Sequence, residues 1–448
     1  MAIHASAGPA GSHGESGQVQ ETQLAPPAPQ AWIALGMLCV VYVLNFLSRQ
    51  LPAILAKPIQ DSLHLSDGQL GRMGGLYFAL FYCCISIPVG WLADKTNRSK
   101  VLAAACAIWS VATMFCGLAA SYLQFVAAYM TVGFGEAGGV PPSYSIICDY
   151  FPAGRRGTAL GLYNIGPPLG AALGIAFGAS IAAAFNWRYA FVSLGAVGLV
   201  AVVGVLWLVP EPRRGGLDHT GNQATASKPS FRRTLAMFFS QPSLLLAALG
   251  SGATQFITYG LGNFTVLFLM REKGMTLREV AVNYALVVAI GMGGSMLASG
   301  RLIDRFTRRS KQAYALIPAS SLALAIPFYL AFVTVSSWRL ALLFLTATLF
   351  LNYFYLSAAV TLVQEEVRPD QRVMSGALLL LVMNFIGLGL GPTFVGAASD
   401  FFHAGHPHHS LQFALYALAP CYLLAILLFL ALARVLRNER HAEGESIA

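Results

Sequence analysis

Long apolar segments separated by short polar loops fill most of this chain. The first runs from Trp32 to Ala56 and holds one charged residue, Arg49. A helix rises about 1.5 Å per residue, so a segment of this length can cross the roughly 30 Å hydrocarbon core of a bilayer. Eleven further apolar segments are predicted to be helices, at about 70–93, 101–119, 122–147, 157–184, 188–209, 243–270, 280–303, 313–335, 338–363, 372–399 and 411–436.

The twelve predicted helices fall into two groups of six, because a polar stretch from Glu211 to Ser240 separates the sixth from the seventh. Only 10% of the residues are charged and 56% are hydrophobic, whereas soluble proteins carry about 25% charged residues. We therefore predict an all-α polytopic membrane protein made of two six-helix pseudo-repeats. The predicted domains are, in order, a disordered tail at 1–30, a bundle at 31–209, a linker at 210–241, a bundle at 242–436 and a tail at 437–448.

The distribution of Lys and Arg predicts the orientation. With the N-terminus inside, the cytoplasmic loops and tails would hold 20 of the 28 basic residues and the external loops 7, the remaining one being Arg49. Basic residues gather in cytoplasmic loops of membrane proteins, so both termini are predicted to be cytoplasmic. The net charge of +9 is explained by this topology, and no nucleic-acid partner is predicted.

Two loop motifs occur once in each half. The segment from Gly90 to Arg98 (GWLADKTNR) recurs 210 residues later as GRLIDRFTR, and DYFPAGR at Asp149 recurs 217 residues later as EVRPDQR. Each half has six spans, so both halves enter the membrane from the same side, as in the parallel repeats of some secondary transporters. The candidate gating-loop residues are Gly90, Asp94, Arg98, Asp149, Arg155, Arg156, Gly300, Asp304, Arg305, Arg308, Glu366 and Arg372.

Two ionisable residues lie inside predicted spans. Arg49 is in the first helix, with Asn45 on the same helical face, and Glu136 is in the middle of the fourth. Charged side chains inside a membrane are costly unless they find a partner or water, so both are functional candidates. The residues leave open whether Arg49 reaches the interface instead, and whether Glu136 carries a proton or belongs to a fixed ion pair.

Further polar residues inside the spans form a candidate set for a solute cavity. Gln255, Tyr259 and Asn263 repeat every four residues and share one face of the seventh helix. Each residue alone fits an interhelical hydrogen bond, but as a set facing inward they would suit an amphipathic solute. The remaining members of the set are Tyr163, Asn164, Asn352, Tyr355 and Asn384.

The doubled Gly-x-Leu-x-Asp-Lys/Arg loop resembles the signature loop of the major facilitator superfamily. The resemblance covers all twelve helices and implies the two-bundle major facilitator fold. In this loop a carboxylate just past a helix end can pair with a basic residue or with a neighbouring helix N-terminus. Asp94 and Asp304 are therefore expected to act in latches that hold the cytoplasmic side closed.

Motifs in the first half are similar to the bacterial branch of the spinster-type facilitators. They are NFLSRQ at Asn45, GFGEAG at Gly133 and DYFP at Asp149, and the similarity is strong over about 32–190. Animal members carry lysolipids and sphingosine phosphate, several of them with protons. The family has an aspartate where this chain has Ser48 and an arginine where it has Tyr129. The resemblance thus implies that a family ion pair is absent here, and Ser48 and Tyr129 could hydrogen-bond instead.

These observations favour a secondary transporter in the bacterial inner membrane that moves an amphipathic organic anion or a lysolipid-like solute with protons. A sensor that binds a solute without transport, or an uncoupled facilitator, is the alternative. No phosphate-binding loop or nucleophile–base pair is recognisable, so we predict neither an enzyme nor a cofactor. Four histidines between His403 and His409 fit a solvated loop better than a metal site. The expected partners are the solute, protons and the bilayer, and the expected state is a monomer.

Overall fold

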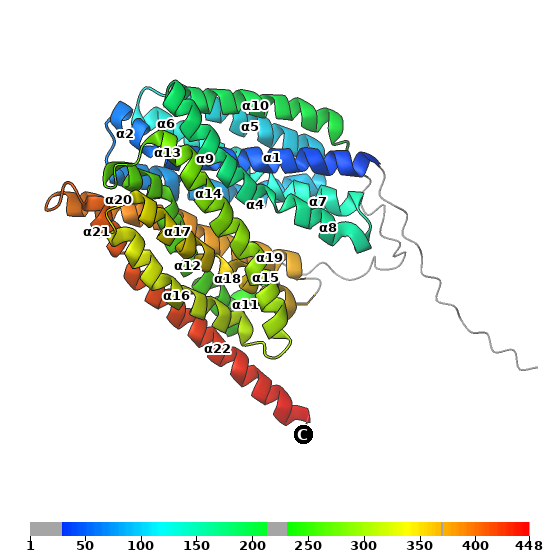
Figure 1. The fold of residues 1–448 in the computed structure, drawn as a ribbon. Coiled ribbons are helices and arrows are strands. Elements are labelled where there is room, and N and C mark those ends of the chain that lie inside the picture. Colours follow the sequence, from blue (N-terminus) through cyan, green and yellow to red (C-terminus); the bar gives the residue numbers. More distant parts are fainter. Residues whose placement is uncertain (1–28, 213–230, 369–370, 448) are drawn as a thin grey trace, which may run out of the picture.

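The computed structural model describes residues 29–212, 231–368 and 371–447, and all regular structure in these ranges is helical (Figure 1). The first helix, α1, begins at Pro29, and the last, α22, ends at Ile447. Both of these ends lie at the same end of the bundle, which we call the terminal face. The opposite end, which carries α2 and α21, is called the distal face.

The first half of the chain forms one group of helices, the upper group in Figure 1. Its elements are α1 (Pro29–Ile54), α2 (Ala56–Leu63), α3 (Asp67–Arg72), η1 (Met73–Tyr77), α4 (Phe78–Lys95), α5 (Arg98–Leu118), α6 (Tyr122–Ala137), α7 (Val140–Tyr150), α8 (Ala153–Tyr163), α9 (Gly166–Ala184) and α10 (Trp187–Leu208). The η elements are single π-helical turns within longer helices.

The second half forms the lower group. Its elements are α11 (Phe231–Ser240), α12 (Pro242–Arg271), α13 (Leu277–Glu279), η2 (Val280–Tyr284), α14 (Ala285–Val288), η3 (Ala289–Gly293), α15 (Gly294–Thr307), α16 (Ala313–Thr334), α17 (Trp338–Asn352), α18 (Phe354–Glu366), α19 (Arg372–Asn384), η4 (Phe385–Leu390), α20 (Gly391–His403), α21 (Ser410–Tyr416) and α22 (Ala419–Ile447).

The helices account for all twelve predicted spans. In the described ranges, eleven helices are long and apolar enough to cross a membrane. The predicted span at 122–147 is absent from that count, and the structure divides it into α6 and α7 at Gly138 and Gly139. Pro141 and Pro142 occupy the start of α7, where a proline costs no helical hydrogen bond. The predicted fold class is therefore confirmed, and the predicted spans at 122–147, 157–184, 338–363 and 411–436 are each divided between two helices.

Large apolar side chains cover the outside of the bundle. Leu123, Val200 and Trp207 are 75%, 72% and 81% exposed. In water such a surface would drive association, but in a bilayer acyl chains cover it. The protein is a multi-pass integral membrane protein.

The two halves touch most closely near the distal face, where α3 and η1 pack against α20 and η4. This contact is made by backbone. A Cβ atom added at Gly71 would collide with the carbonyl oxygen of Pro392, and one added at Gly396 would collide with that of Asp67. At these positions only glycine allows the two helices to approach so closely.

Candidate functional site

Two oppositely charged side chains meet in the interior of the first half. Arg49 on α1 donates from Nε (3.0 Å) and Nη2 (2.8 Å) to Oε2 of Glu136 on α6. Ser48 Oγ donates to the other carboxylate oxygen, Oε1, over 2.7 Å. The Glu136 side chain is fully buried and that of Arg49 is 8% exposed. The two charged candidates from the sequence are thus brought together, and Ser48 completes their contacts.

Glycines on α6 let the Glu136 carboxylate reach α1. A Cβ atom added at Gly135 would lie 2.6 Å from the backbone nitrogen of Trp109 on α5. One added at Gly133 would lie 3.1 Å from the carbonyl oxygen of Phe78 on α4. Both contacts leave little or no room for a side chain. The glycines of the GFGEAG motif therefore let α6 pack closely against α4 and α5, and this packing sets the position of the Glu136 carboxylate.

Aromatic rings surround the guanidinium of Arg49. Its Cζ lies 4.9 Å from the ring centre of Phe46, 5.2 Å from Phe78 and 4.8 Å from Tyr82. Tyr259 on α12, in the second half, also interacts electrostatically with this charge. A ring in contact with a cation contributes about 0.5–1 kcal/mol at exposed sites and about 2 kcal/mol or more where water is excluded. The site therefore combines a neutralised charge pair with apolar surface, and it touches both halves.

The hydroxyl of Ser48 gives a direct test of this geometry. Ser48→Ala would leave Oε1 of buried Glu136 without its donor, which costs about 1–3 kcal/mol. We expect a lower thermal unfolding temperature for the purified protein in lipid nanodiscs. Ser48→Thr keeps the hydroxyl and should unfold close to the wild type. Equal losses in both variants would show that packing at this position matters more than the hydrogen bond.

Ser48 does not bond to Tyr129, the partner that the sequence suggested. Its hydroxyl donates to Glu136 and to the carbonyl oxygen of Asn45. Tyr129 is 3% exposed and its ring packs against Phe78 and Phe125, with centre distances of 5.1 and 6.3 Å. The hydroxyl follows the stronger acceptor, because a carboxylate accepts stronger hydrogen bonds than a phenol.

A second polar cluster lies toward the terminal face of the first half. Tyr163 on α8 stacks on Tyr42, with ring centres 4.4 Å apart, and meets Tyr144 edge-on. The Tyr144 hydroxyl donates to Oδ1 of Asn164 over 2.7 Å. Asn164 is exposed while Tyr163 is buried. Tyr163 and Asn164 therefore belong to one tyrosine-rich cluster, in which Tyr163 is buried and Asn164 lies at the edge.

In the second half, the candidates on α12 differ in their surroundings. Asn263 donates to the carbonyl oxygen of Tyr259, and its own Oδ1 would lie 2.6 Å from a Cβ atom added at Gly74 of the first half. It thus lies between the halves. Gln255 is buried against Gly387 of η4, and Asn384 is half-buried.

Asn352 and Tyr355 lie in the packing of the second half, which differs from the cavity position expected for them. Asn352 is fully buried and donates to the hydroxyl of Tyr422 over 2.9 Å. Tyr355 is 2% exposed. Helical periodicity places a residue on a face but does not tell whether that face meets a cavity or another helix of the same half.

At the terminal face the first-half loop motif forms a compact ion network. Arg98 at the start of α5 donates to Glu211 (2.7 Å), Asp149 (2.6 Å) and Ser145 (2.7 Å). Its side chain is 3% exposed, although the sequence indicated a loop residue. Arg156 donates to two backbone carbonyls at the end of α7. The motif thus ties α5, α7 and the segment after α10 together.

The corresponding contact of the second half is a pair between Lys311 and Glu366, 3.4 Å apart. The three ion pairs that the described residues form at this face, Arg98 with Asp149, Arg98 with Glu211 and Lys311 with Glu366, each join elements of one half. The Asp94 side chain lies outside the described part of the structure. The exposed members of the gating set are Arg155, Asp304, Arg305, Arg308 and Arg372. A Cβ atom added at Gly90 would lie 3.9 Å from the Cβ atom of Pro141, and one added at Gly300 would have no neighbour within 4 Å.

The histidine loop at the distal face is anchored by Glu272. Oε1 of Glu272 accepts hydrogen bonds from the backbone nitrogens of Leu411 (3.0 Å) and Gln412 (3.3 Å), and His409 lies 3.7 Å from Oε2. Burial raises the pKa of the Glu272 carboxyl and lowers the pKa of the neighbouring Lys273 ammonium. Among the described residues no group of three or more His, Cys, Asp or Glu side chains could hold a metal ion.

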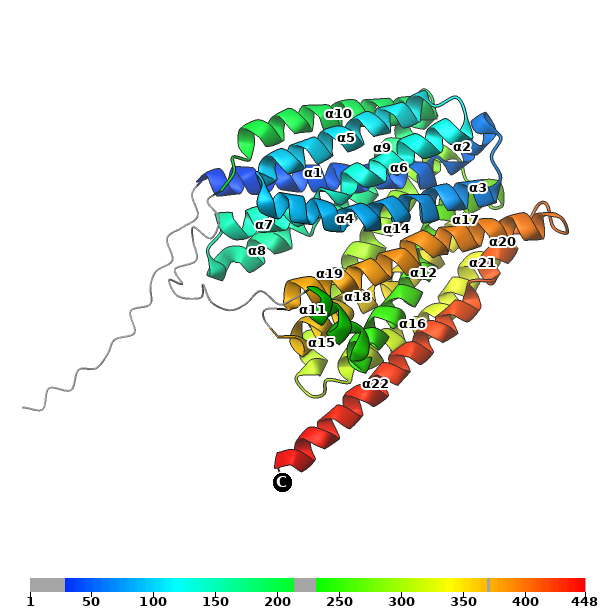
Figure 2. The ribbon, with the colours of Figure 1, turned by 180° about the vertical axis from the view of Figure 1, so that it is seen from behind.

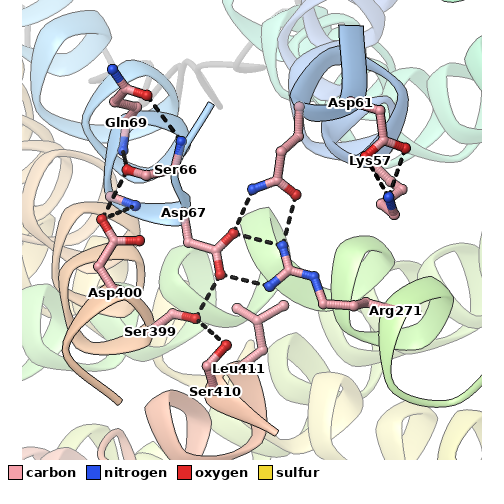
Figure 3. Close-up of polar contacts among 12 residues, drawn as sticks. Lys57, Asp61, Ser66, Asp67, Gln69, Arg271, Ser399, Asp400, Ser410 and Leu411 are labelled. Atoms are coloured by element: carbon pink, nitrogen blue, oxygen red, sulfur yellow. Dashed lines mark hydrogen bonds and ion pairs between the residues drawn. The ribbon is translucent and has the colours of Figure 1, made fainter. Parts of the chain in front are cut away.

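Sequence reasoning missed a polar network that joins the halves at the distal face, centred on Asp67 and Arg271 (Figure 3). The residues were recognised only as charges at the ends of spans. A usable signal was present, since each stands where a predicted span meets an external loop, on the side with few charges.

Two bundles of membrane-crossing helices, with a buried ion pair close to where they meet, define a secondary transporter. The chain belongs to the Major Facilitator Superfamily, whose model matches residues 38–392. This confirms the resemblance found in the loop motifs, and members of this family are transporters rather than enzymes.

Relatives extend the similarity to spinster-type proteins. The chain is 32% identical to an MFS-type efflux pump of Mycolicibacterium smegmatis over 83% of this chain and 85% of the relative. It is 27% identical to protein spinster homolog 3 of Mus musculus over 86% and 78%. A solved bacterial homologue of the human lysosomal transporter Spinster, in an inward-facing and unoccupied conformation, superposes with a TM-score of 0.85 at 29% identity, over 92% of this chain and 99% of the other.

Proposed function

We propose that this protein moves an amphipathic small organic solute, an organic anion or a lysolipid-like molecule, across the bacterial inner membrane by alternating access, with protons as the coupling ion. In this proposal the terminal face is cytoplasmic, as the distribution of basic residues indicates. The protein acts as a monomer, because each chain holds both halves of the transport unit.

The observation that carries the proposal is the buried Arg49–Glu136 pair. It supplies one cation for an anionic group, and the rings of Phe46, Phe78 and Tyr82 supply apolar surface for the rest of the solute. A multiply charged hydrophilic solute would need more than one buried cation. The relative named as an efflux pump favours transport over sensing.

Competition for Arg49 provides a coupling mechanism. An anionic group that binds Arg49 displaces Glu136, and a displaced carboxylate in an apolar site takes up a proton rather than remain charged. When the solute leaves, Arg49 returns to Glu136 and the proton is released. Solute binding and proton binding are thereby linked through one side chain.

An uncoupled facilitator is the second candidate, and one observation favours it. Both carboxylate oxygens of Glu136 are engaged, by Arg49 and by Ser48. A carboxylate held in this way is stabilised in its charged form, so the pair would stay fixed through the cycle. Transport would then follow the solute gradient alone.

Glu136→Gln separates the two candidates. The amide resembles a protonated carboxyl but does not titrate, so we expect loss of accumulation driven by a pH gradient while solute exchange continues. Uptake and counterflow are measured side by side in proteoliposomes, with radiolabelled lysolipids and small organic acids as probes. Glu279→Gln, a change at a half-buried residue of the distal face, is the matched control, because glutamine can also complete the capping box that Glu279 forms with Thr276. Undiminished gradient-driven accumulation by Glu136→Gln would favour the facilitator.

A further inference from the structure

A groove runs along the outer side of the first half, between α5 and α6, which lie side by side there (Figure 2). It has a volume of about 870 Å³. On α5 its wall includes Phe115 and Leu118, which are 59% and 65% exposed. On α6 the facing positions include the small residues Ala127 and Ala128. The groove thus arises because large side chains on one helix stand beside small ones on the next.

The groove has the depth of one leaflet of a bilayer. Its residues on α5 and just after it run from Ala107 to Ala119, a length of roughly 18 Å at about 1.5 Å per residue. Those on α6 run from Gln124 to Thr131. Half of the hydrocarbon core is roughly 15 Å thick. Both sets of residues begin at the loop that joins α5 to α6, so the groove runs from this loop to about the middle of the membrane and suits one acyl chain.

The loop end of the groove lies at the distal face and carries a positive charge. Arg188 at the start of α10 donates from Nη2 to the carbonyl oxygen of Ala119, a groove residue, over 3.0 Å. Its Nη1 donates to Ser62 Oγ on α2, also over 3.0 Å. Its Cζ lies 4.3 Å from the ring centre of Trp187, and tryptophan rings are typical of the interface between acyl chains and headgroups. The guanidinium is therefore held where the headgroups begin.

No carboxylate among the described residues neutralises Arg188. Its contacts are with a hydroxyl, a backbone carbonyl and an aromatic ring, and none of the ion pairs of the described residues includes it. Asp61, beside Ser62, pairs instead with Lys57 of its own helix. A guanidinium carries five N–H donors in a planar fork that suits phosphate oxygens. The phosphate of a lipid at the bilayer surface is an anion within its reach.

Gln124 adds a neutral donor at the same end of the groove. The side chain is exposed, and its Oε1 accepts from the backbone nitrogen of Ala120 over 2.9 Å. Its amide NH₂ group has no partner among the described residues. An apolar groove with donors at its outer end matches the two parts of a phospholipid, an acyl chain and a phosphate. An ammonium balances the phosphate of phosphatidylethanolamine but not that of phosphatidylglycerol, so an unpaired arginine favours the anionic lipid.

We propose that this groove, lined by α5 and α6 and bordered at its distal end by Arg188, binds an anionic phospholipid, with one acyl chain along the groove and the phosphate on the guanidinium. The lipid joins α5, α6 and α10 of the first half. It supplies the negative charge that the described part of the protein does not place beside Arg188. Its binding requires no solute and is independent of the transport proposed above.

Binding is measured by native mass spectrometry of the full chain, delipidated in detergent and titrated with dioleoyl phosphatidylglycerol or dioleoyl phosphatidylethanolamine. We expect the wild type to bind one molecule of phosphatidylglycerol more tightly than phosphatidylethanolamine. Arg188→Gln should weaken phosphatidylglycerol binding about tenfold, which is the effect of losing one hydrogen bond to a charged group, and should change phosphatidylethanolamine binding less. Arg188→Lys keeps the charge and should retain most of the preference.

The matched control for the charge is Arg339→Gln. Arg339 also follows a tryptophan at the start of a helix, and its Cζ lies 5.3 Å from the ring centre of Trp338. It does not line the groove. This variant should bind both lipids as the wild type does.

The acyl-chain part of the site is tested by Ala127→Phe, which fills the groove and leaves Arg188 in place. Both lipids should then bind about tenfold less tightly, which is the effect of displacing about two CH₂ groups from an apolar site. Ala323→Phe is the matched control, because Ala323 is an exposed alanine of α16 in the second half. It should leave lipid binding unchanged.

Either of two results would overturn the lipid site. One is phosphatidylglycerol binding by Arg188→Gln as tight as that by Arg339→Gln, and the other is lipid binding by Ala127→Phe as tight as that by Ala323→Phe. A wild-type dimer that Ala127→Phe dissociates would also overturn it, since a second copy of the chain would then cover the groove.

Discussion

Arg49→Met is expected to cost about 3–5 kcal/mol of folding stability, because it leaves the buried carboxylate of Glu136 without its cation. Methionine fills a similar volume and packs against the rings of Phe46, Phe78 and Tyr82, so the loss reports the charge rather than a cavity. Transport should be lost as well. The stability change is measured as thermal unfolding in lipid nanodiscs and the transport change as counterflow.

The double variant Arg49→Met/Glu136→Gln tests whether the loss of stability in Arg49→Met comes from the unpaired charge of Glu136. It contains neither charge, so most of the lost stability should return, while transport remains absent. Arg49→Lys keeps the charge but cannot donate from Nε and Nη2 together, and it should fall between the wild type and Arg49→Met. A double variant no more stable than Arg49→Met alone would contradict coupling between the two side chains.

Arg98→Ala is the second change with a large expected effect. It leaves the carboxylates of Asp149 and Glu211 close together with no guanidinium between them, and it disconnects α5 from α7 and from the segment after α10. Removing one partner of such a buried network costs about 3–5 kcal/mol. We expect a clear fall in unfolding temperature and in the yield of folded protein.

Lys100→Ala is the matched control for Arg98→Ala, because Lys100 is an exposed basic residue two positions away in the same helix. It should behave like the wild type. Adding Glu211→Gln to Arg98→Ala removes the charge of one of the two carboxylates that had bonded to Arg98, and it should restore part of the stability. An Arg98→Ala protein that unfolds together with the Lys100→Ala control would show that the network is not structural.

The fold could be predicted from the sequence because the thickness of the bilayer sets the length of each apolar segment. Sequence length alone did not reveal the break of the fourth span at Gly138, although two glycines followed by Pro141 and Pro142 are a recognisable signal for it. The short helix α2 was also missed, since all of its eight residues except Ala56 lie outside the predicted apolar segments.

At the site, the sequence identified the charged residues correctly, because charged side chains are rare inside membrane spans. Arg49 and Glu136 are charges inside spans, and the cost of burying each identified both as candidates. The sequence left open whether they pair, and the structure shows the contact. A neutral polar residue inside a span does not require a charged partner. The position of Asn352 inside the second half could therefore not be predicted from the sequence. The polar network at the distal face was missed because Asp67 and Arg271 are 204 residues apart, and a position at the end of a span does not show which other span end it meets.

The backbone contact between α3 and α20 has a consequence for the speed and accuracy of the transport cycle. Side chains that interlock must each find one rotamer before two surfaces can join, which slows closure and allows misfitted intermediates. The surfaces at Gly71, Gly75, Gly389 and Gly396 present backbone and the small side chain of Thr393, so few side chains have to change rotamer when they meet again. In the proposed transport cycle, closure can then return to the same register in every turnover, once the polar contacts of Asp67, Asp400 and Thr393 have re-formed.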